Sequence, residues 1–302
     1  MQHLLAELEQ IETLANGSKL DRLRAKPFNY IFAAWHRICL YPLTKKGVLR
    51  EVTTFFKQKM YVLLPAGTDL YLLGGKSHTS ELRLAKFILN ELKTNDIFID
   101  IGAHFGYFTL LAATMVGKNG KVVSFEAAKN TFALLEKNTA TLPQIQIFHR
   151  AISNKTENLS FFEFPVLYSE YNSSYIEQFE NEAWIQKFKP EKVSVAAISL
   201  DEALSSLNIH PDLIKIDVEG AEDKVFQGAS QFLTTNETCQ IVMEYLNPTR
   251  HNEAHQKAKI LIEGFGYHCH IITQKGELLP MKDVDAYLLT HDLDSDNVVF
   301  KK

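Results

Sequence analysis

The sequence has few cysteines, no long apolar run and no excess of positive charge. Its three cysteines, Cys39, Cys239 and Cys269, are far apart in a chain of 302 residues, and this spacing provides neither a disulfide framework nor a metal-ligand pattern. We therefore expect free thiols in a reducing, cytoplasmic environment. No segment approaches the ~18 apolar residues of a membrane span. The first residues carry an early acid and no long apolar core, so no signal peptide is expected.

The charge balance argues against nucleic acid as a partner. The net charge is −4 and the isoelectric point is near 6.3, whereas surfaces that bind nucleic acid are usually strongly basic. Hydrophobic residues make up 46% of the chain, which is enough for a large core. We expect a helical extension over residues 1–54, a β-hairpin with a lead-in helix over 55–95, and a catalytic domain over 96–302. The sequence does not indicate the oligomeric state.

Apolar residues recur at helical spacing in the N-terminal part, which predicts helices over residues 2–15 and 30–40. The second helix is rich in aromatic residues, which is typical either of a membrane or partner surface or of packing against the main domain. Because it lacks a dense row of lysines, we favour packing. Two apolar runs, Met60–Leu64 and Asp69–Leu73, flank a Pro-Ala-Gly-Thr turn and predict a hairpin. A further helix is predicted over Ser80–Glu91.

The most informative stretch is Ile97–Phe108, with the sequence IFIDIGAHFGYF. An apolar run ends in Asp100, two glycines follow, and a helical pattern begins, which is typical of a strand, a tight turn and a helix. Gly102 and Gly106 permit a sharp turn and a close ligand. Unpaired N–H groups at the helix start favour an anion. The Asp100 carboxylate can contact a cation or accept a hydrogen bond from a donor. Three interpretations are open. The first is a site for S-adenosylmethionine (SAM), which carries both charges. The second is a dinucleotide-binding turn, whose glycine spacing the sequence does not match, and the third is an ordinary strand-to-helix turn.

Strand and helix patterns then alternate, as in an α/β fold with a parallel sheet. The next strand ends in Glu126, which could accept hydrogen bonds from both ribose hydroxyls of SAM or NAD; a solvent-facing acid is the alternative. Ala151 and Ile152 follow the third strand and are plausible walls for an adenine. The polar and aromatic segment 168–176 is either a substrate loop for sugars and similar polyols or an ordinary surface loop.

A second informative stretch is Asp212–Glu222, DLIKIDVEGAE, in which a buried strand ends in acids before Gly220. Asp217 and Glu219 are two residues apart, so in an extended chain both face the crevice at the strand end. Close carboxylates there suit proton abstraction, divalent metal binding or a contact with the SAM ammonium. The alternative is that Asp217 and Glu222 cap the next helix. Nothing else in the sequence demands a metal, and an H-E-x-x-H motif is absent, so we interpret the remaining histidines, His251, His255, His268 and His270, as surface or packing residues.

Four segments together resemble the FkbM-type methyltransferases: Phe98–Tyr107, Ser124–Ala127, Ser199–Asp201 and, most specifically, Asp212–Glu222. The resemblance covers about residues 55 to 302. It implies a Rossmann-like, seven-stranded class I methyltransferase sheet, mostly parallel with an antiparallel last strand and helices on both faces. It also implies bound SAM and, usually, O-methylation of a hydroxyl on a sugar, glycan or related secondary metabolite. Two residues depart from the family pattern: His104 replaces an asparagine and Ala127 replaces a proline.

The resemblance and the residue patterns together give a set of expected SAM contacts: Glu81, Asp100, Gly102, Ala103, His104, Gly106, Tyr107, Glu126, Ala151, Ile152 and Asp217. The expected reaction is in-line transfer of the SAM methyl group to an oxygen. A positioned base accelerates such a step by about 10²–10⁴-fold; the candidates are Asp217, Glu219 and His104, with Asp217 first because strand geometry aims it into the crevice, and His104 with an ordinary pKa near 6.5. The alternatives are a catalytically degenerate SAM-binding partner in glycan assembly and, less favoured, an NAD-dependent reductase.

Overall fold

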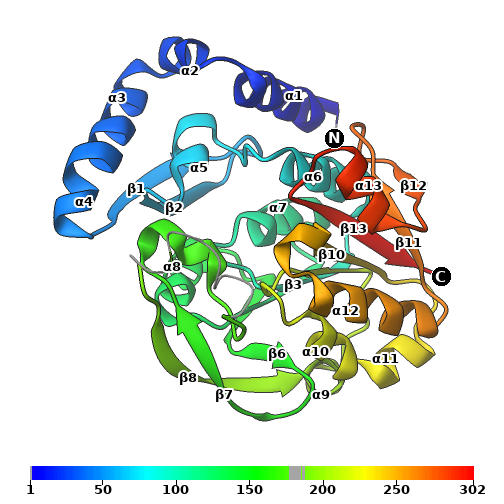
Figure 1. Cartoon of the computed structure of the whole chain (residues 1–302). Coiled ribbons are helices and arrows are strands. Elements are labelled where there is room, and N and C mark those ends of the chain that lie inside the picture. The colour runs from blue at the N-terminus through cyan, green and yellow to red at the C-terminus, as the bar shows by residue number, and fades with distance from the viewer. Residues whose placement is uncertain (1, 177–184, 186–187) are drawn as a thin grey trace.

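The computed structural model describes residues 2–176, 185 and 188–302. Its centre is an eight-stranded sheet in the order β12-β11-β13-β10-β9-β3-β4-β5 (Figure 1). Five adjacent strands, from β10 to β5, run parallel, and β13 is antiparallel to both of its neighbours. The bounds are β3 (Ile97–Ile101), β4 (Lys121–Glu126), β5 (Ile145–His149), β9 (Leu213–Ile216), β10 (Gln240–Leu246), β11 (His268–Ile272), β12 (Leu278–Pro280) and β13 (Ser295–Lys301).

This sheet confirms the predicted fold class, with one addition. Seven of its strands form the expected mostly parallel sheet with an antiparallel last strand, β13. The eighth, β12, pairs antiparallel with β11 at the edge of the sheet and was not predicted. Three residues are too short a run for the alternation of apolar and polar side chains to show in the sequence.

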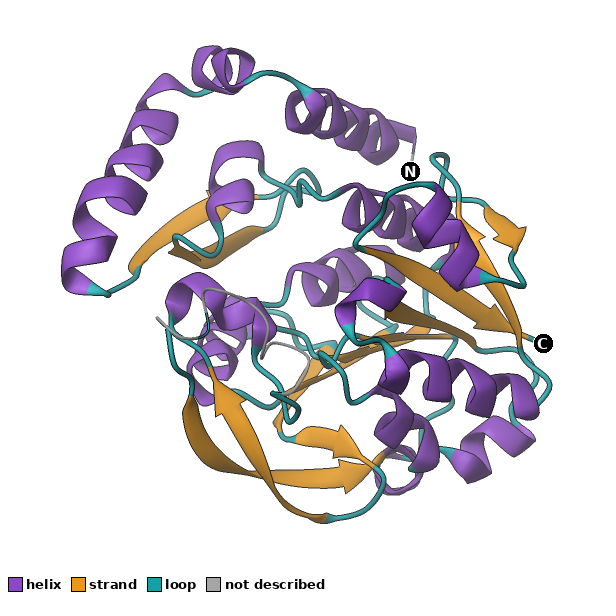
Figure 2. Ribbon diagram, in the orientation of Figure 1, coloured by secondary structure: helices purple, strands orange, loops and turns teal. Residues whose placement is uncertain are grey.

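Helices cover both faces of the sheet (Figure 2), because neighbouring residues of a buried parallel strand point to opposite sides. Phe98 packs in the core beneath α6 (Thr79–Glu91) and α7 (Tyr107–Val116). Ile99 packs in the opposite core. That second core contains side chains of α9 (Leu200–Leu207), α10 (Glu222–Gln227), α11 (Ser230–Thr235), α12 (Glu253–Gly264) and α13 (Val284–Thr290).

A smaller three-stranded sheet lies beside the main one and contains β6 (Ala151–Ser153), β7 (Glu157–Glu163) and β8 (Glu191–Ser199), in the order β6-β8-β7. The 3₁₀ segment η2 (Val166–Tyr171) follows β7 and occupies part of the loop predicted over 168–176. A second 3₁₀ turn, η4 (Pro248–Arg250), follows β10. Among the described residues, no helix combines the length and the apolar character needed to cross a bilayer.

The N-terminal part begins with α1 (Gln2–Asn16), which buries Leu8 and Ile11 and packs on α6. The chain continues through α2 (Lys19–Ala25), α3 (Pro27–Trp35), the π-helical η1 (His36–Leu40) and α4 (Tyr41–Thr44). These helices form an arch around the outer edge of the molecule, in blue in Figure 1. Both predicted N-terminal helices are confirmed.

The hairpin prediction is wrong in one strand. Lys59–Leu64 forms β2, but its antiparallel partner is β1 (Val48–Thr53), upstream of it. Residues 69–73, predicted as the second strand, belong to helix α5 (Thr68–Leu73). Gly74 ends this helix in the left-handed conformation, with φ of +77°, which glycine adopts without strain. A helix of six residues is too short to reveal its period in the sequence.

Helix α8 (Lys129–Thr139) ties the hairpin to the main sheet through one side chain. Asn138 Oδ1 accepts a hydrogen bond from Tyr61 N at 2.6 Å, and its Nδ2 donates to the carbonyl oxygens of Tyr61 and Phe105 at 2.9 and 2.8 Å. Phe105 belongs to the turn between β3 and α7. One amide therefore links the hairpin to this turn, beside the apolar packing of Met60 and Val62 in the same core.

Candidate active site

A cavity of about 420 Å³ lies at the carboxyl ends of β3, β4, β9 and β10. This is the edge of a parallel sheet where ligands usually bind, and the volume is typical of a small-molecule site. The predicted site residues that line it are Glu81, Gly102, His104, Glu126, Ala151, Ile152, Asp217 and Glu219. Asp100, Ala103, Gly106 and Tyr107 belong to the same turn but do not line the cavity.

Asp100 lies behind the cavity wall and supports it. Its side chain is fully buried; Oδ2 accepts a hydrogen bond from Thr109 Oγ1 at 2.6 Å, and Oδ1 lies 3.6 Å from Lys215 Nζ. Burial raises the pKa of Asp100, and the nearby Lys215 ammonium opposes that rise. The predicted direct contact with a ligand cation is therefore replaced by an ion pair with the protein's own lysine.

The two glycines make the turn around which the cavity forms. Gly102 has φ of +82°, and a Cβ on it would lie 1.7 Å from the carbonyl oxygen of Asp217. Gly106 has φ of +88°, precedes α7, and would place a Cβ 2.6 Å from Leu135 Cδ1. Both positions combine the left-handed region with close packing, so only glycine fits them without displacement of a neighbour.

Glu126 ends β4 and faces the cavity. Its Oε2 accepts from His104 N at 2.7 Å, and its Oε1 accepts from Ala128 N at 2.8 Å and Thr131 Oγ1 at 2.9 Å. Burial raises the pKa of Glu126, while these hydrogen bonds oppose the rise. Each carboxylate oxygen has two acceptor positions, so Oε1 is fully used and Oε2 keeps one position for a ligand hydroxyl. Beside it, Ile152 offers an apolar wall suited to a base.

Opposite charges meet on another wall of the cavity. Lys76 Nζ lies 2.8 Å from Glu81 Oε1, and both residues line the cavity. Burial alone would lower the pKa of Lys76, but Glu81 and Asp69 together raise it well above its usual range. A fixed ammonium beside a carboxylate complements the carboxylate and ammonium of an amino acid. Lys76 was not predicted, because a lysine that follows a Gly-Gly pair looks like an ordinary loop residue.

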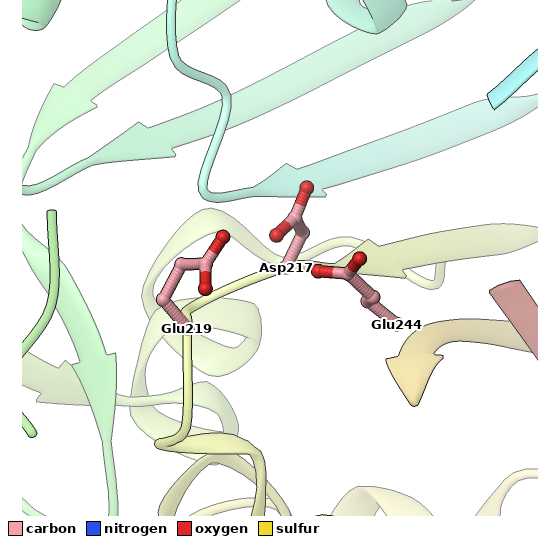
Figure 3. Close-up of side chains that lie close together, drawn as sticks. All are labelled: Asp217, Glu219 and Glu244. Atoms are coloured by element: carbon pink, nitrogen blue, oxygen red, sulfur yellow. The ribbon is translucent and has the colours of Figure 1, made fainter. Parts of the chain in front are cut away.

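Three carboxylates converge next to this space: Asp217, Glu219 and Glu244 (Figure 3). One oxygen of each lies within 4.8 Å of the others. Lys215 Nζ lies 3.0 Å from Asp217 Oδ2, and Ser295 Oγ donates to Glu244 Oε1 at 2.8 Å. Burial, aided by Asp217, raises the pKa of Glu244 to about 8, and burial with Glu244 raises the pKa of Glu219 well above its usual range. The cluster therefore requires protons or a cation to balance its charge.

Glu244 was not among the predicted site residues, although the sequence shows that it closes an apolar run over Ile241–Tyr245. The alternative that Asp217 and Glu222 cap the next helix is wrong, because α10 has no side-chain cap and the Glu222 carboxylate binds the loop before the helix. Glu222 Oε2 accepts from Gly220 N at 3.1 Å and lies 3.3 Å from His255 Nε2. The packing role favoured for His255 is thus confirmed, and Asp217 faces the cavity.

His104 lines the cavity from a strained position, with φ of +49°. Its Nε2 lies 3.1 Å from Ser169 Oγ, and its ring stacks on Phe105. Burial lowers the pKa of His104 to about 3, and the charges of Lys76 and Lys215 add to this effect. The intrinsic pKa near 6.5 that made His104 a candidate base is thus lowered in the fold, and the sequence could not show this because Lys76 and Lys215 come from distant segments.

A doubly wound sheet with a cavity at its carboxyl edge, a glycine turn after the first central strand and an acid at the tip of the second define a class I SAM-dependent methyltransferase. The chain belongs to the FkbM methyltransferase family, since the model of the methyltransferase FkbM domain matches residues 100–269. Its cofactor is SAM. The residues that line the cavity fit SAM: Glu126 offers an acceptor for a ribose hydroxyl, Ile152 an apolar wall for the base, and Lys76 with Glu81 a pair of charges for the amino-acid end.

Solved structures with detectable similarity are distant. The methyltransferase FkbM from Methylobacillus flagellatus KT is 12% identical, with a TM-score of 0.42; the match covers 78% of this chain and 52%, about half, of that one. Fibrillarin from Aeropyrum pernix, crystallised with SAM, is 12% identical over 72% of this chain and 74% of its own, with a TM-score of 0.41. A SAM-dependent O-methyltransferase from Thermotoga maritima is 14% identical over 87% and 81%, with a TM-score of 0.40. No curated protein matches the sequence.

Proposed function

We propose that this methyltransferase transfers the methyl group of SAM to a hydroxyl of a polyol acceptor, such as a sugar, a glycan or a related secondary metabolite. The observation that carries the proposal is the convergence of Asp217, Glu219 and Glu244 on one side of the cavity. Carboxylates accept hydrogen bonds from hydroxyl groups and can take up the proton that an alcohol releases. SAM supplies an activated methyl group on a sulfonium.

The protein's contribution begins with positioning. Glu126 Oε2 would accept a hydrogen bond from a ribose hydroxyl, and the pair of Lys76 and Glu81 would hold the amino-acid end. Correct orientation of two reactants is worth up to about 7–11 kcal/mol of the barrier. The buried turn at Gly102 brings the backbone against Asp217, so the cofactor side and the acceptor side of the cavity are fixed relative to each other.

Asp217 is the carboxylate that we assign to the acceptor hydroxyl. Burial and the neighbouring carboxylates raise the pKa of Glu219, and burial with Asp217 raises the pKa of Glu244 to about 8. A carboxyl group that keeps its proton can donate a hydrogen bond to another acceptor oxygen. Lys215 fixes the orientation of the Asp217 carboxylate. A divalent cation held by Asp217 and Glu219 is the alternative, because such cations prefer carboxylate oxygens.

The test is single-turnover transfer from methyl-labelled SAM to a panel of sugars and cell extracts, with mass spectrometry of the product. Asp217→Asn should lower transfer by about 10²–10⁴-fold while calorimetry shows SAM bound as before. Undiminished transfer by this variant would remove Asp217 from the role. SAM binding without transfer to any acceptor would favour the degenerate partner, and binding of NADH instead of SAM would favour a reductase. Loss of transfer in EDTA, restored by Mg²⁺, would favour the cation.

A further inference from the structure

The N-terminal arch presents an apolar stripe that nothing in the described chain covers. Helices α3, η1 and α4 follow one another without a break from residue 27 to residue 44. Phe28, Ile31, Trp35 and Ile38 are 85, 60, 49 and 73% exposed, and Leu43 near the end is 85% exposed. The first four are spaced by three, four and three residues, so they lie along one helix face. Large side chains gathered on one face at this exposure mark an interaction surface.

The opposite side of the same helices is attached to the protein. Ala33, His36 and Tyr41 are buried, and the ring of Phe32 lies 6.4 Å from the ring of Tyr71 in α5. The packing that we favoured from the sequence therefore explains only the inner face. The outer face, along the rim of the molecule in Figure 1, needs a separate explanation.

The charge around the stripe is opposite in sign to that of the whole protein. Residues 19–50 contain eight lysines and arginines and one acid, Asp21, which gives a net charge of +7, whereas the whole chain carries −4. Most of these bases are exposed, namely Lys19, Arg24, Lys26, Arg37, Lys45 and Lys46. The helix itself lacks a row of lysines, but basic side chains border it on both sides, at residues 19–26 and 45–46, and Arg37 lies within it.

We propose that the basic segment of residues 19–50, which contains α2, α3, η1 and α4 of this arch, docks on the surface of an anionic phospholipid bilayer. A helix with an apolar face that includes Trp and Phe, bordered by Lys and Arg, is the arrangement that lies in the headgroup region of such a membrane. Anionic headgroups attract the basic flanks. A second copy of the chain fits less well, since two segments of charge +7 repel each other. The proposal is independent of the identity of the methyl acceptor.

The inner face of the arch, opposite the proposed docking face, reaches the cavity. Tyr41 Oη accepts a hydrogen bond from Leu167 N at 3.1 Å. Leu167 belongs to η2, and the neighbouring residues Ser169, Glu170 and Tyr171 line the cavity. The inner face of the arch therefore contacts one wall of the site.

The test is co-sedimentation of the full chain with vesicles of phosphatidylglycerol and phosphatidylcholine, against vesicles of phosphatidylcholine alone. The wild type should bind the anionic vesicles, and high salt should weaken the binding. Ile38→Ser should lower the affinity by about tenfold or more. Ile260→Ser is the matched control, because Ile260 is 70% exposed on α12, outside the arch, and it should bind as the wild type does.

Two further measurements test the contribution of the basic residues and the insertion of Trp35 into the bilayer separately. Lys45→Gln combined with Lys46→Gln should lower the affinity for anionic vesicles by about fivefold per lysine. In a Trp184→Phe background Trp35 is the only tryptophan, and its emission should shift to the blue on addition of anionic vesicles. SAM affinity measured by calorimetry shows that each variant is folded.

Three results would overturn the proposal. The first is no binding of the wild type to anionic vesicles. The second is equal loss of binding in Ile38→Ser and Ile260→Ser, or in neither. The third is self-association of the wild type without vesicles that Ile38→Ser abolishes, which would identify the stripe as a contact between copies of this chain.

Discussion

Replacement of Gly102 by alanine tests whether the turn after β3 sets the geometry of the site. The new Cβ would lie 1.7 Å from the carbonyl oxygen of Asp217, so that the carbonyl must move by about 1.3 Å before a 3.0 Å contact is restored. The left-handed φ of +82° adds about 1–2 kcal/mol, and overpacking adds about 1–3 kcal/mol. We expect the free energy of unfolding to fall by about 2–5 kcal/mol.

The functional effect should exceed the effect on stability, because the displaced carbonyl belongs to Asp217. A misplacement of about 1 Å near the reacting groups costs on the order of 10²-fold in rate, and we expect a loss of this size in single-turnover transfer. Gly266→Ala is the matched control: its φ is +87°, but nothing lies within 4 Å of its Cβ. Urea unfolding and SAM calorimetry measure both variants. If they lose stability equally and Gly102→Ala keeps wild-type SAM affinity and transfer, the steric argument is refuted.

Three further predictions concern charged and titrating groups of the site. Lys215→Met leaves Asp100 without its buried ion-pair partner and should lower the free energy of unfolding by about 3–5 kcal/mol; Lys155→Met, in an exposed pair with Glu157, should change it by less than about 1 kcal/mol, and similar urea midpoints for the two would contradict this. The pKa of Glu244 is raised to about 8, so the folded chain keeps a proton that the unfolded chain releases near pH 4–5. The free energy of unfolding should therefore decline as pH rises from about 5 to 8. Glu244→Gln should make this decline shallower, and an unchanged slope would show that Glu244 does not cause it. His104→Asn should keep kcat within about threefold, because a ring with a pKa near 3 is a poor base; a loss of about 10²-fold or more at unchanged SAM affinity would restore His104 as the base.

The sequence predicts what is local in the chain. The strand, glycine turn and helix at Ile97–Phe108 follow one another directly, and so do the strand and acids at Asp212–Glu222. Each pattern is complete within a dozen residues, so periodicity and glycine placement were sufficient to locate the elements.

The parts that were missed depend on contacts between distant segments. Glu244 meets Asp217 only because β10 and β9 pair in the sheet, and no local pattern records which strands are neighbours. Lys76 reaches the cavity from a loop between two helices. The environment of His104 depends on that same lysine and on Lys215, so its pKa could not be inferred from residue type. Charge and burial of a site belong to the assembled fold rather than to any one segment.

The amide of Asn138 has a consequence for any shortened form of the protein. It satisfies both the N–H and the C=O of Tyr61, as a neighbouring strand would, so at this residue the edge of the hairpin has no free backbone group for another chain. A version that starts after residue 64 would remove both of these partners, expose the Asn138 amide to water, and uncover the apolar core into which Met60 and Val62 pack. The loss would fall on the residue that also braces Phe105. Residues up to 64 and the main sheet should therefore be expressed and engineered as one unit.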